Sequence, residues 1–245
     1  MKMSLRTLLK KSPLRYAYNR IKLLLVNTSQ SNEGLILKAI TKNCPKTFIE
    51  FGFHPAQYNC IKLSDFVGLL IDADSDTVKL AKALLPKRIE VMNVFLTLAN
   101  LDVVINKFTK LGVLSVDIDG NDYWILEGLM PTKPNVIAVE YNASLGLNSI
   151  TVPYDPAFER NANHCTGWYH GASITALVKL CARYGYKLVA VSTSGGNAFF
   201  TPEANELPSL DPVTAYRENS LRNRWSKTTA SEQWEKIKDL PYVTI

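Results

Sequence analysis

The middle of the chain alternates between short, almost continuously apolar runs and longer segments in which apolar residues recur every three or four positions. Continuous apolar runs rich in β-branched residues are typical of parallel strands that are covered on both faces. A spacing of three and four residues is what an amphipathic helix requires. The predicted strands are residues 47–53, 67–73, 89–95, 113–119 and 135–141, and the predicted helices are residues 56–66, 75–85, 100–111 and 121–130. Ser75 and Asn100 are the expected N-caps of two of these helices.

The pattern changes at the end of this region. Residues 173–186 predict one more helix, which Gly185 ends, and two short strands follow at 187–193 and 197–201. The turn between them contains two glycines and is typical of a hairpin, so the last strand should run antiparallel. We therefore expect an α/β fold. It is a doubly wound, Rossmann-like sheet of seven strands, mostly parallel with a C-terminal antiparallel hairpin, with helices on both faces.

One long segment interrupts the alternation of strands and helices. Residues 143–172 separate the fifth strand from the next helix and are rich in Tyr, Trp, His, Asn and Asp. Long loops inside compact domains are often lids, and this one leaves the carboxyl end of a strand, where ligands bind in open α/β sheets. The predicted organisation is a basic helical extension (1–44), a main domain (45–201) that includes the lid, and a C-terminal tail (202–245).

Positive charge is concentrated at the N-terminus. Seven Lys and Arg residues precede the first acid, Glu33, within a chain of net charge +6. Leucines and tyrosines are interleaved with them, which favours an amphipathic helix that either lies on an anionic membrane surface or covers the domain with its basic side chains in solvent. No apolar run reaches the roughly 18 residues of a membrane-spanning helix, and basic residues interrupt the region where a signal peptide would be apolar. The expected location is the cytoplasm, with peripheral contact at the inner membrane face under the first interpretation.

Composition sets two further bounds. The chain is 47% hydrophobic and 20% charged, which suits a folded core and excludes general disorder. The four cysteines contain no C-x-x-C pair, so we expect free thiols in a reducing compartment.

The turn after the first strand lacks the common nucleotide-binding motifs. In "EFGFHP" only Gly52 is available, so the G-x-G-x-x-G fingerprint of dinucleotide-binding proteins is absent, as is the G-x-x-x-x-G-K-[ST] phosphate loop. What remains is Glu50 beside Gly52, and Asp72 about 20 residues later, where a carboxylate can accept the ribose hydroxyls of an adenosine ligand. The alternative is a turn at each strand end that is satisfied by its own backbone.

Several motifs together resemble one enzyme family. These are "SVDIDGNDYWILEGL", "VEYN", "TVPYDPAF", "GWYHGASITALVKL" and "GGNAFF". In this order they are similar to a bacterial branch of the FkbM-like sugar O-methyltransferases, which are S-adenosylmethionine-dependent enzymes of the seven-strand class. The resemblance covers about residues 45–201. It departs from the family at "EFGFHP", which lacks the second and third glycines of E/D-x-G-x-G-x-G, so His54 and Pro55 must leave room for the methionine moiety.

The resemblance implies a role for each strand end. Glu50 and Gly52 would line the methionine end of S-adenosylmethionine, and Asp72 would hold the ribose. Asn93 would approach the adenine, and Asp117 would sit beneath the reacting sulfonium. The implied activity is methyl transfer to a sugar hydroxyl, with bacterial surface glycan biosynthesis as the implied context.

Acids and amides gather at the ends of the fourth and fifth predicted strands. Alternating residues share one face of a strand, and neighbouring parallel strands end at the same edge of the sheet. Carboxylate and amide oxygens are ligands that suit Mg²⁺, which could lower the pKa of an acceptor hydroxyl. The candidate metal ligands are Asp117, Asp119, Glu140 and Asn142. The alternative is that Asn121 and Asp122 cap a helix and that Asn142 belongs to a turn.

The candidates for the catalytic base, and for contacts with the acceptor substrate, lie in the lid or beside it. The base candidates are Asp119, His164 and His170, of which the histidines could equally be ordinary loop residues. Tyr154, Asp155 and Trp168 are candidates for contacts with sugar hydroxyls and ring faces.

Two other functions stay open at this point. The single glycine of the first turn favours a non-catalytic module that binds an adenosyl ligand on the same fold, whereas the acid cluster disfavours it. Nucleic-acid modification would use the basic N-terminus, but no recognition module or aromatic stacking motif supports it. The expected partner is therefore a small-molecule or glycan acceptor, and no nucleic acid is expected.

Overall fold

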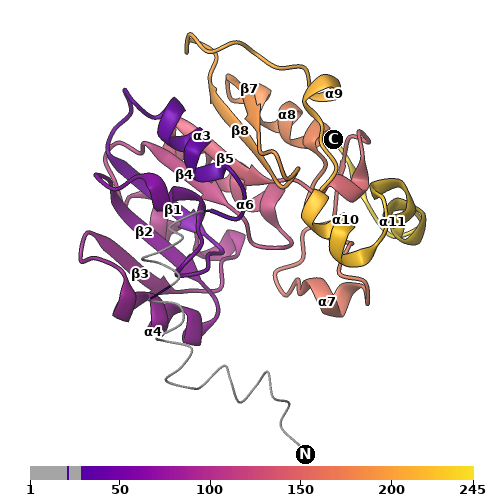
Figure 1. The fold of residues 1–245 in the computed structure, drawn as a ribbon, viewed down its shortest axis with the longest axis horizontal. Coiled ribbons are helices and arrows are strands. Elements are labelled where there is room, and N and C mark those ends of the chain that lie inside the picture. The colour runs from indigo at the N-terminus through magenta and orange to yellow at the C-terminus, as the bar shows by residue number, and fades with distance from the viewer. Residues whose placement is uncertain (1–20, 22–28) are drawn as a thin grey trace, which may run out of the picture.

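A computed structural model describes residue 21 and residues 29–245, so the predicted basic N-terminal helix lies largely outside the described residues. The main sheet has seven strands in the order β3-β2-β1-β4-β5-β8-β7 (Figure 1). Only β8 runs antiparallel to its neighbours, which confirms the predicted fold class and the closing hairpin. The strands are β1 (Thr47–Phe51), β2 (Val67–Asp72), β3 (Ile89–Asn93), β4 (Val113–Val116), β5 (Val136–Glu140), β7 (Tyr186–Val191) and β8 (Asn197–Pro202).

Helices cover both faces of this sheet because its strands are apolar on both sides. Ile49 and Phe51 of β1 belong to one hydrophobic cluster, whereas Phe48 belongs to a second cluster on the opposite face. Burying one such side chain contributes about 1.5–3 kcal/mol. The first cluster includes residues of α5 (Asp102–Ile105), α6 (Asp122–Leu129) and α8 (Ile174–Arg183), and the second includes residues of α3 (Glu33–Ile40) and α4 (Ser75–Leu84).

Two predicted helices are much shorter than expected. In place of a helix over 56–66 there is one 3-10 turn, η1 (Asn59–Lys62), because the buried carboxylate of Glu50 accepts from the backbone N–H groups of Asn59 and Cys60. In place of a helix over 100–111 there are η2 (Leu98–Asn100) and the four residues of α5, whose β-branched sequence favours helix weakly.

Both expected N-caps are wrong. Asp74, not Ser75, caps α4, and its carboxylate accepts from the N–H groups of Asp76 and Thr77. Asn100 does not begin a helix. Its side chain closes a capping box with Thr97 at η2 instead.

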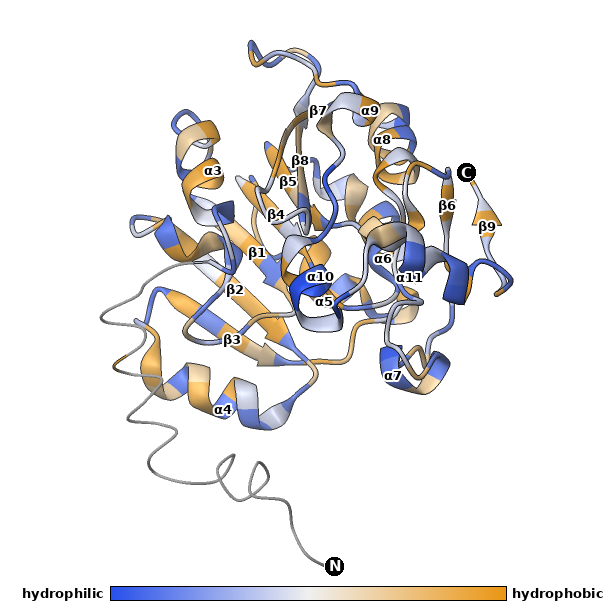
Figure 2. Ribbon diagram, turned by 45° about the vertical axis from the view of Figure 1, so that its right-hand side comes forward, coloured by the Kyte–Doolittle hydropathy of each residue, from blue (hydrophilic) through white to orange (hydrophobic). Residues whose placement is uncertain are grey.

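The lid and the C-terminal tail fold together beyond the carboxyl edge of the sheet (Figures 1 and 2). Strand β6 (Ile150–Thr151) of the lid pairs with β9 (Val243–Thr244) at the end of the chain. A third hydrophobic cluster joins lid residues such as Val152 and Phe158 to Ile237 of the tail. The remaining elements are η3 (Met130–Thr132), η4 (Ala143–Leu145), α7 (Arg160–Asn163), α9 (Pro212–Ala215), α10 (Ser220–Ser226) and α11 (Ala230–Ile237).

Two further expectations concern the cysteines and membrane-spanning helices. All four cysteines are free thiols, as predicted. Among the described residues, no helix combines the length and the apolarity needed to cross a bilayer.

Candidate active site

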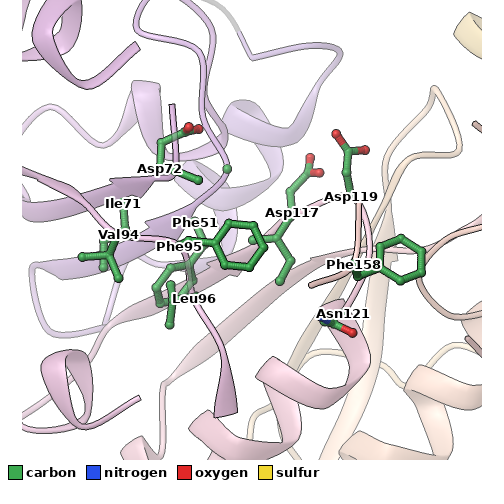
Figure 3. A pocket seen from close by; sticks show the side chains of 13 residues that line it. Phe51, Ile71, Asp72, Val94, Phe95, Leu96, Asp117, Asp119, Asn121 and Phe158 are labelled. Atoms are coloured by element: carbon green, nitrogen blue, oxygen red, sulfur yellow. The ribbon is translucent and has the colours of Figure 1, made fainter. Parts of the chain in front are cut away.

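Three cavities meet at the carboxyl edge of the sheet, where the strand order reverses between β1 and β4. The switch-point cavity, about 220 Å³, is open to the ends of β1, β2, β3 and β4 (Figure 3). The glycine-side cavity, about 170 Å³, shares Gly52 and Asp117 with it, and the lid cavity, about 480 Å³, shares Asp119. Ligands of open α/β sheets bind at such a reversal point.

Gly52 is required by the close approach of two loops. Its φ is +67°, and a Cβ at this position would lie 1.5 Å from the backbone oxygen of Asp117. The turn after β1 therefore packs directly on the turn after β4. This contact brings the two predicted cofactor residues to the wall of the same cavity.

Glu50 is fully buried and holds the turn after β1. Its two carboxylate oxygens lie 2.7 and 2.8 Å from the backbone nitrogens of Asn59 and Cys60. Burial raises the pKa of Glu50 to about 7, although both hydrogen bonds favour the charged form. The residue also lines the glycine-side cavity, so it lies where the resemblance places the methionine end of the cofactor.

Asp72 and Phe95 both line the switch-point cavity. The half-buried carboxylate of Asp72 accepts from the backbone N–H groups of Phe53 and Asp74, and each of its oxygens retains a second lone pair. Asn93 does not line this cavity. Its amide donates to the backbone oxygens of Asp72 and Ala73. The half-exposed ring of Phe95, which was not among the predicted site residues, lines the cavity.

The acid cluster is built differently from the predicted strand. β4 ends at Val116, and Asp119 has a φ of +58°, so Asp117 and Asp119 are loop residues and do not alternate on one strand. Asp122 holds this loop, because its carboxylate accepts from the backbone N–H groups of Ile118 and Gly120. The capping alternative is wrong for this pair, because Asn121 makes no side-chain cap and Asp122 binds the preceding loop. Its other part is confirmed: Asn142 belongs to a turn, where its side chain accepts from the backbone N–H of Ser144.

Burial and mutual repulsion raise the pKa of the acids in this cluster. Burial is the larger cause for Asp117, and the carboxylate of Glu140 is the next. For Glu140, burial and then the charge of Asp119 raise the pKa to about 8. Both groups hold their protons more tightly than ordinary carboxyls, so each would gain from a cation placed between them.

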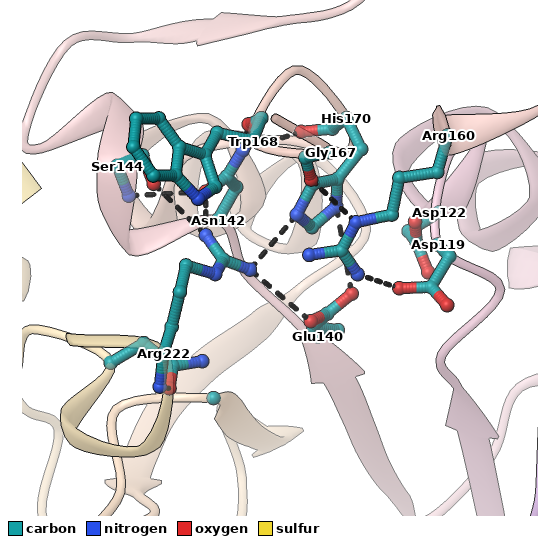
Figure 4. A network of polar contacts seen from close by, with 12 residues as sticks. Asp119, Asp122, Glu140, Asn142, Ser144, Arg160, Gly167, Trp168, His170 and Arg222 are labelled. Carbon is teal, nitrogen blue, oxygen red and sulfur yellow. Dashed lines mark hydrogen bonds and ion pairs between the residues drawn. The ribbon is translucent and has the colours of Figure 1, made fainter. Parts of the chain in front are cut away.

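Two arginines, neither of them predicted as site residues, reach into the cluster (Figure 4). Arg160 of α7 forms an ion pair with Asp119, and its Nε donates to the backbone oxygen of Gly167 over 2.6 Å. Arg222 of α10 has a side chain only 10% exposed, and its Nη2 lies 3.9 Å from Oε1 of Glu140. Nothing in the local sequence distinguishes either arginine, because both act on residues distant in the chain.

His170 is fully buried between Arg222 and Glu140. Its Nε2 lies 2.9 Å from Nη2 of Arg222, and its Nδ1 lies 3.7 Å from Oε2 of Glu140. Neither Nδ1 of His170 nor Oε2 of Glu140 has a hydrogen-bond partner among the described residues. His164 lies elsewhere: its Nδ1 bonds the hydroxyl of Thr166, and it lines none of the three cavities.

The predicted Mg²⁺ site is not supported by these contacts. The amide oxygen of Asn142 already accepts from the backbone N–H of Ser144 and from Arg222. Ligand atoms of Asp119, Glu140 and His170 do lie within 4.8 Å of one another, as do those of Asp117, Asp122 and Glu140. The guanidinium groups of Arg160 and Arg222 already bring positive charge to these acids, so the predicted four-ligand set does not fit an ion.

The three predicted acceptor residues are not brought together. The hydroxyl of Tyr154 accepts from the backbone N–H of Leu98, and the carboxylate of Asp155 accepts from that of Ala157. Trp168 lines the lid cavity, opposite the tail residue Trp225, which is 86% exposed.

Comparisons with known proteins give matches in structure only. No protein-family model and no curated protein matches the chain. An O-methyltransferase from Bacillus cereus in complex with SAH is 16% identical, and the match covers 75% of this chain and 89% of that one with a TM-score of 0.49. A methyltransferase from Geobacter sulfurreducens is 14% identical, with coverage of 78% and 88% and a TM-score of 0.48. The N-terminal domain of EvdMO1 with SAH bound is 10% identical, with coverage of 76% and 94% and a TM-score of 0.45. Likenesses this weak say nothing of cofactor or reaction, which have to be argued from the residues of this chain.

Proposed function

We propose that this protein is an S-adenosylmethionine-dependent O-methyltransferase that acts on a sugar hydroxyl. The observation that carries the proposal is the carboxyl group of Glu140, whose Oε2 is buried and has no hydrogen-bond partner among the described residues. Ligand atoms of Glu140 and Asp117 lie within 4.8 Å of each other, and Asp117 lines both the switch-point and the glycine-side cavities. Glu140 itself does not line these cavities, and Asp117 connects it to the two inner ones.

The cofactor fits the two inner cavities by its chemistry. In the switch-point cavity the carboxylate of Asp72 accepts the ribose hydroxyls, and the ring of Phe95 lies against the adenine. Glu50 and Gly52 would hold the methionine part in the glycine-side cavity. Asp117, which lines both inner cavities, would face the sulfonium, and a positive charge there would offset the desolvation of the acids.

The residues of the chain then supply positioning and proton removal. When bound, S-adenosylmethionine supplies an electrophilic methyl group, and the acceptor oxygen takes it as the carbon–sulfur bond breaks. Glu140 accepts the hydroxyl proton at Oε2, and its raised pKa makes it a stronger base than an ordinary carboxylate. Holding the two reactants in line contributes about 7–11 kcal/mol in favourable cases. Asp119, one of the predicted bases, forms an ion pair with Arg160, so we do not assign it this role.

The acceptor enters through the lid cavity. Two tryptophans, Trp168 and Trp225, offer flat apolar surfaces there, and Thr166 and Ser226 offer hydroxyl groups. Apolar faces combined with a few polar groups suit a sugar ring. The proposed setting, surface glycan synthesis in the bacterial cytoplasm, follows from the motif resemblance.

One observation favours the alternative of a non-catalytic adenosyl-binding module. The helix expected after β1 is replaced by η1, so fewer backbone N–H groups face the cavity than a full helix start would present. Such a module would bind the cofactor and would transfer no methyl group to any acceptor.

The test is a calorimetric titration of S-adenosylmethionine into the wild-type protein, Asp72→Ala and Asp76→Ala. Loss of charged hydrogen bonds to the ribose should weaken binding to Asp72→Ala by about 2–3 kcal/mol, roughly 30- to 150-fold. Asp76 lies on the exposed start of α4 beside Lys79, so Asp76→Ala should bind like the wild type. No heat with the wild type at millimolar cofactor would refute the proposal. Binding without release of demethylated cofactor on any carbohydrate acceptor would favour the module.

A further inference from the structure

We infer that Arg222, from the C-terminal helix α10, is a positioning residue of the site: it fixes His170 in one tautomer and aims a ring N–H at Glu140. The catalytic consequence rests on the proposed function, but the tautomer does not. Arg222 lies in the tail, outside the region of motif resemblance, and the sequence offers no sign of this role.

The tautomer follows from donors and acceptors. A guanidinium group has five N–H donors and no acceptor. Nη2 of Arg222 lies 2.9 Å from Nε2 of His170, so Nε2 must accept the bond and cannot carry a proton. The neutral ring therefore carries its proton on Nδ1. The same contact disfavours a second proton, in line with burial and two nearby arginines, which lower the pKa of His170.

The Nδ1–H then faces the carboxylate of Glu140. Nδ1 of His170 and Oε2 of Glu140 are 3.7 Å apart, which is too far for a direct hydrogen bond. Both atoms are buried and unpartnered among the described residues. Buried polar groups are almost always hydrogen-bonded. A hydroxyl oxygen that approaches this pair from one side can accept from Nδ1–H of His170 and donate its proton to Oε2 of Glu140, which leaves a lone pair on that oxygen for attack.

The guanidinium is held firmly enough to impose this arrangement. Its Nη1 donates to Oδ1 of Asn142 over 2.6 Å and to the hydroxyl of Ser144 over 2.9 Å. Ser144 in turn donates to the buried amide oxygen of Gln233 in α11. A lysine has one ammonium group and cannot reproduce the planar fork that reaches three partners at once.

Arg222 also acts on Glu140 by charge. The groups that face Glu140 are Asp117, Asp119 and Asp122 from the loop after β4, Arg160 from α7, His170 from the lid and Arg222 from α10. Removing the positive charge of Arg222 leaves Arg160 as the one cation among these groups, against three acids. The ionised base then becomes harder to form, so activity should require a higher pH.

The tautomer is tested by nitrogen-15 NMR of histidine-labelled protein, with His170 assigned by comparison with His170→Gln. In the wild type we expect a protonated Nδ1 and an unprotonated Nε2 that do not titrate between pH 6 and 8. In Arg222→Lys we expect a mixture of tautomers. A wild-type His170 protonated at Nε2, or a tautomer unchanged in Arg222→Lys, would overturn the inference without any activity measurement.

The catalytic consequence is tested by kinetics of Arg222→Lys and Arg222→Gln, with Arg224→Lys on the exposed face of the same helix as the control. We expect kcat to fall by about 10- to 100-fold in both variants, as when a partner that orients a site histidine is lost. The KM for S-adenosylmethionine should not change, and the pH profile of kcat/KM should move upward only in Arg222→Gln. Unchanged kcat, or an equal effect of Arg224→Lys, would contradict the positioning role. Failure of wild-type cofactor binding would instead refute the proposed function and leave the NMR result standing.

Discussion

At the scale of single residues, the site is a balance of buried charges. The carboxylates of Asp117, Asp122 and Glu140 approach one another within 4.8 Å, and burial opposes the ionisation of each. Removing one partner of a buried charge pair usually costs stability because the other charge is left without compensation. Arg222 and Arg160 provide that compensation from outside the sheet.

Glu140 should make the protein less stable as pH rises. Its pKa is raised to about 8 from an ordinary value of 4.5. Between these pH values the folded protein holds a proton that the unfolded chain has released, so the free energy of unfolding falls as pH rises through this window. Glu140→Gln removes this contribution. The stability of the variant relative to the wild type should therefore increase from pH 5 to pH 8, by roughly 3–4 kcal/mol.

The measurement is urea unfolding of both proteins at several pH values. Glu206→Gln, at an exposed position, is the matched control and should follow the wild type. A stability difference between Glu140→Gln and the wild type that stays constant across the window would contradict the buried, protonated state.

At the scale of elements, the site depends on contacts between loops that follow different strands, and on two short helices outside the sheet. The turn after β1 packs on the loop after β4 at Gly52, and the short helices α7 and α10 each contribute one arginine. None of these segments has a large buried face of its own. The third hydrophobic cluster and the pairing of β6 with β9 join the lid, which contains α7, to the tail, which contains α10.

Gly52→Ala should disrupt the contact between the two turns. The new Cβ would meet the backbone oxygen of Asp117, and the residue would keep a positive φ. A left-handed conformation and overpacking together should reduce the free energy of unfolding by about 2–5 kcal/mol. Gly185→Ala is the matched control, because Gly185 has a φ of +76° but a Cβ added there would meet nothing within 4 Å. It should cost only about 1–2 kcal/mol. Equal losses in denaturant unfolding would show that the close approach is unimportant.

At the scale of the whole molecule, the sheet could be predicted and the completed site could not. Continuous apolar runs and the glycine turn at 194–196 were sufficient for the strands and the antiparallel hairpin. The predicted strand ends also included Asp72 and Asp117, and both residues line the switch-point cavity. Arg222 bonds His170 and Asn142 across 52 and 80 residues of sequence, and no local pattern encodes such pairs. The helix expected over 56–66 failed for the same reason, since Glu50 holds its backbone from another element.

We propose contact with an anionic membrane surface from two observations: the basic sequence of the N-terminal segment, and a group of lysines among the described residues. Lys38, Lys42, Lys46 and Lys62 surround one surface cavity, and Leu35 beside them is 61% exposed. Each lysine near an anionic surface contributes about 1 kcal/mol. We expect the full chain to sediment with phosphatidylserine vesicles at low salt and to be released at high salt. Changing Lys38, Lys42 and Lys62 to Gln should weaken binding. Equal binding to neutral vesicles would contradict the electrostatic part.

The proposed function requires that Asp117, after β4, and Glu140, at the end of β5, face a cationic sulfonium. The most direct measurement is a titration of S-adenosylmethionine at pH 7.5 in two buffers of different ionisation enthalpy, repeated with the uncharged S-adenosylhomocysteine. Burial and neighbouring acids raise the pKa values of Asp117 and Glu140. A positive charge beside them should lower those values and release protons. We expect the binding heat of S-adenosylmethionine to differ between the buffers and that of S-adenosylhomocysteine to differ much less. Absence of binding, or the same buffer dependence for both ligands, would contradict the account.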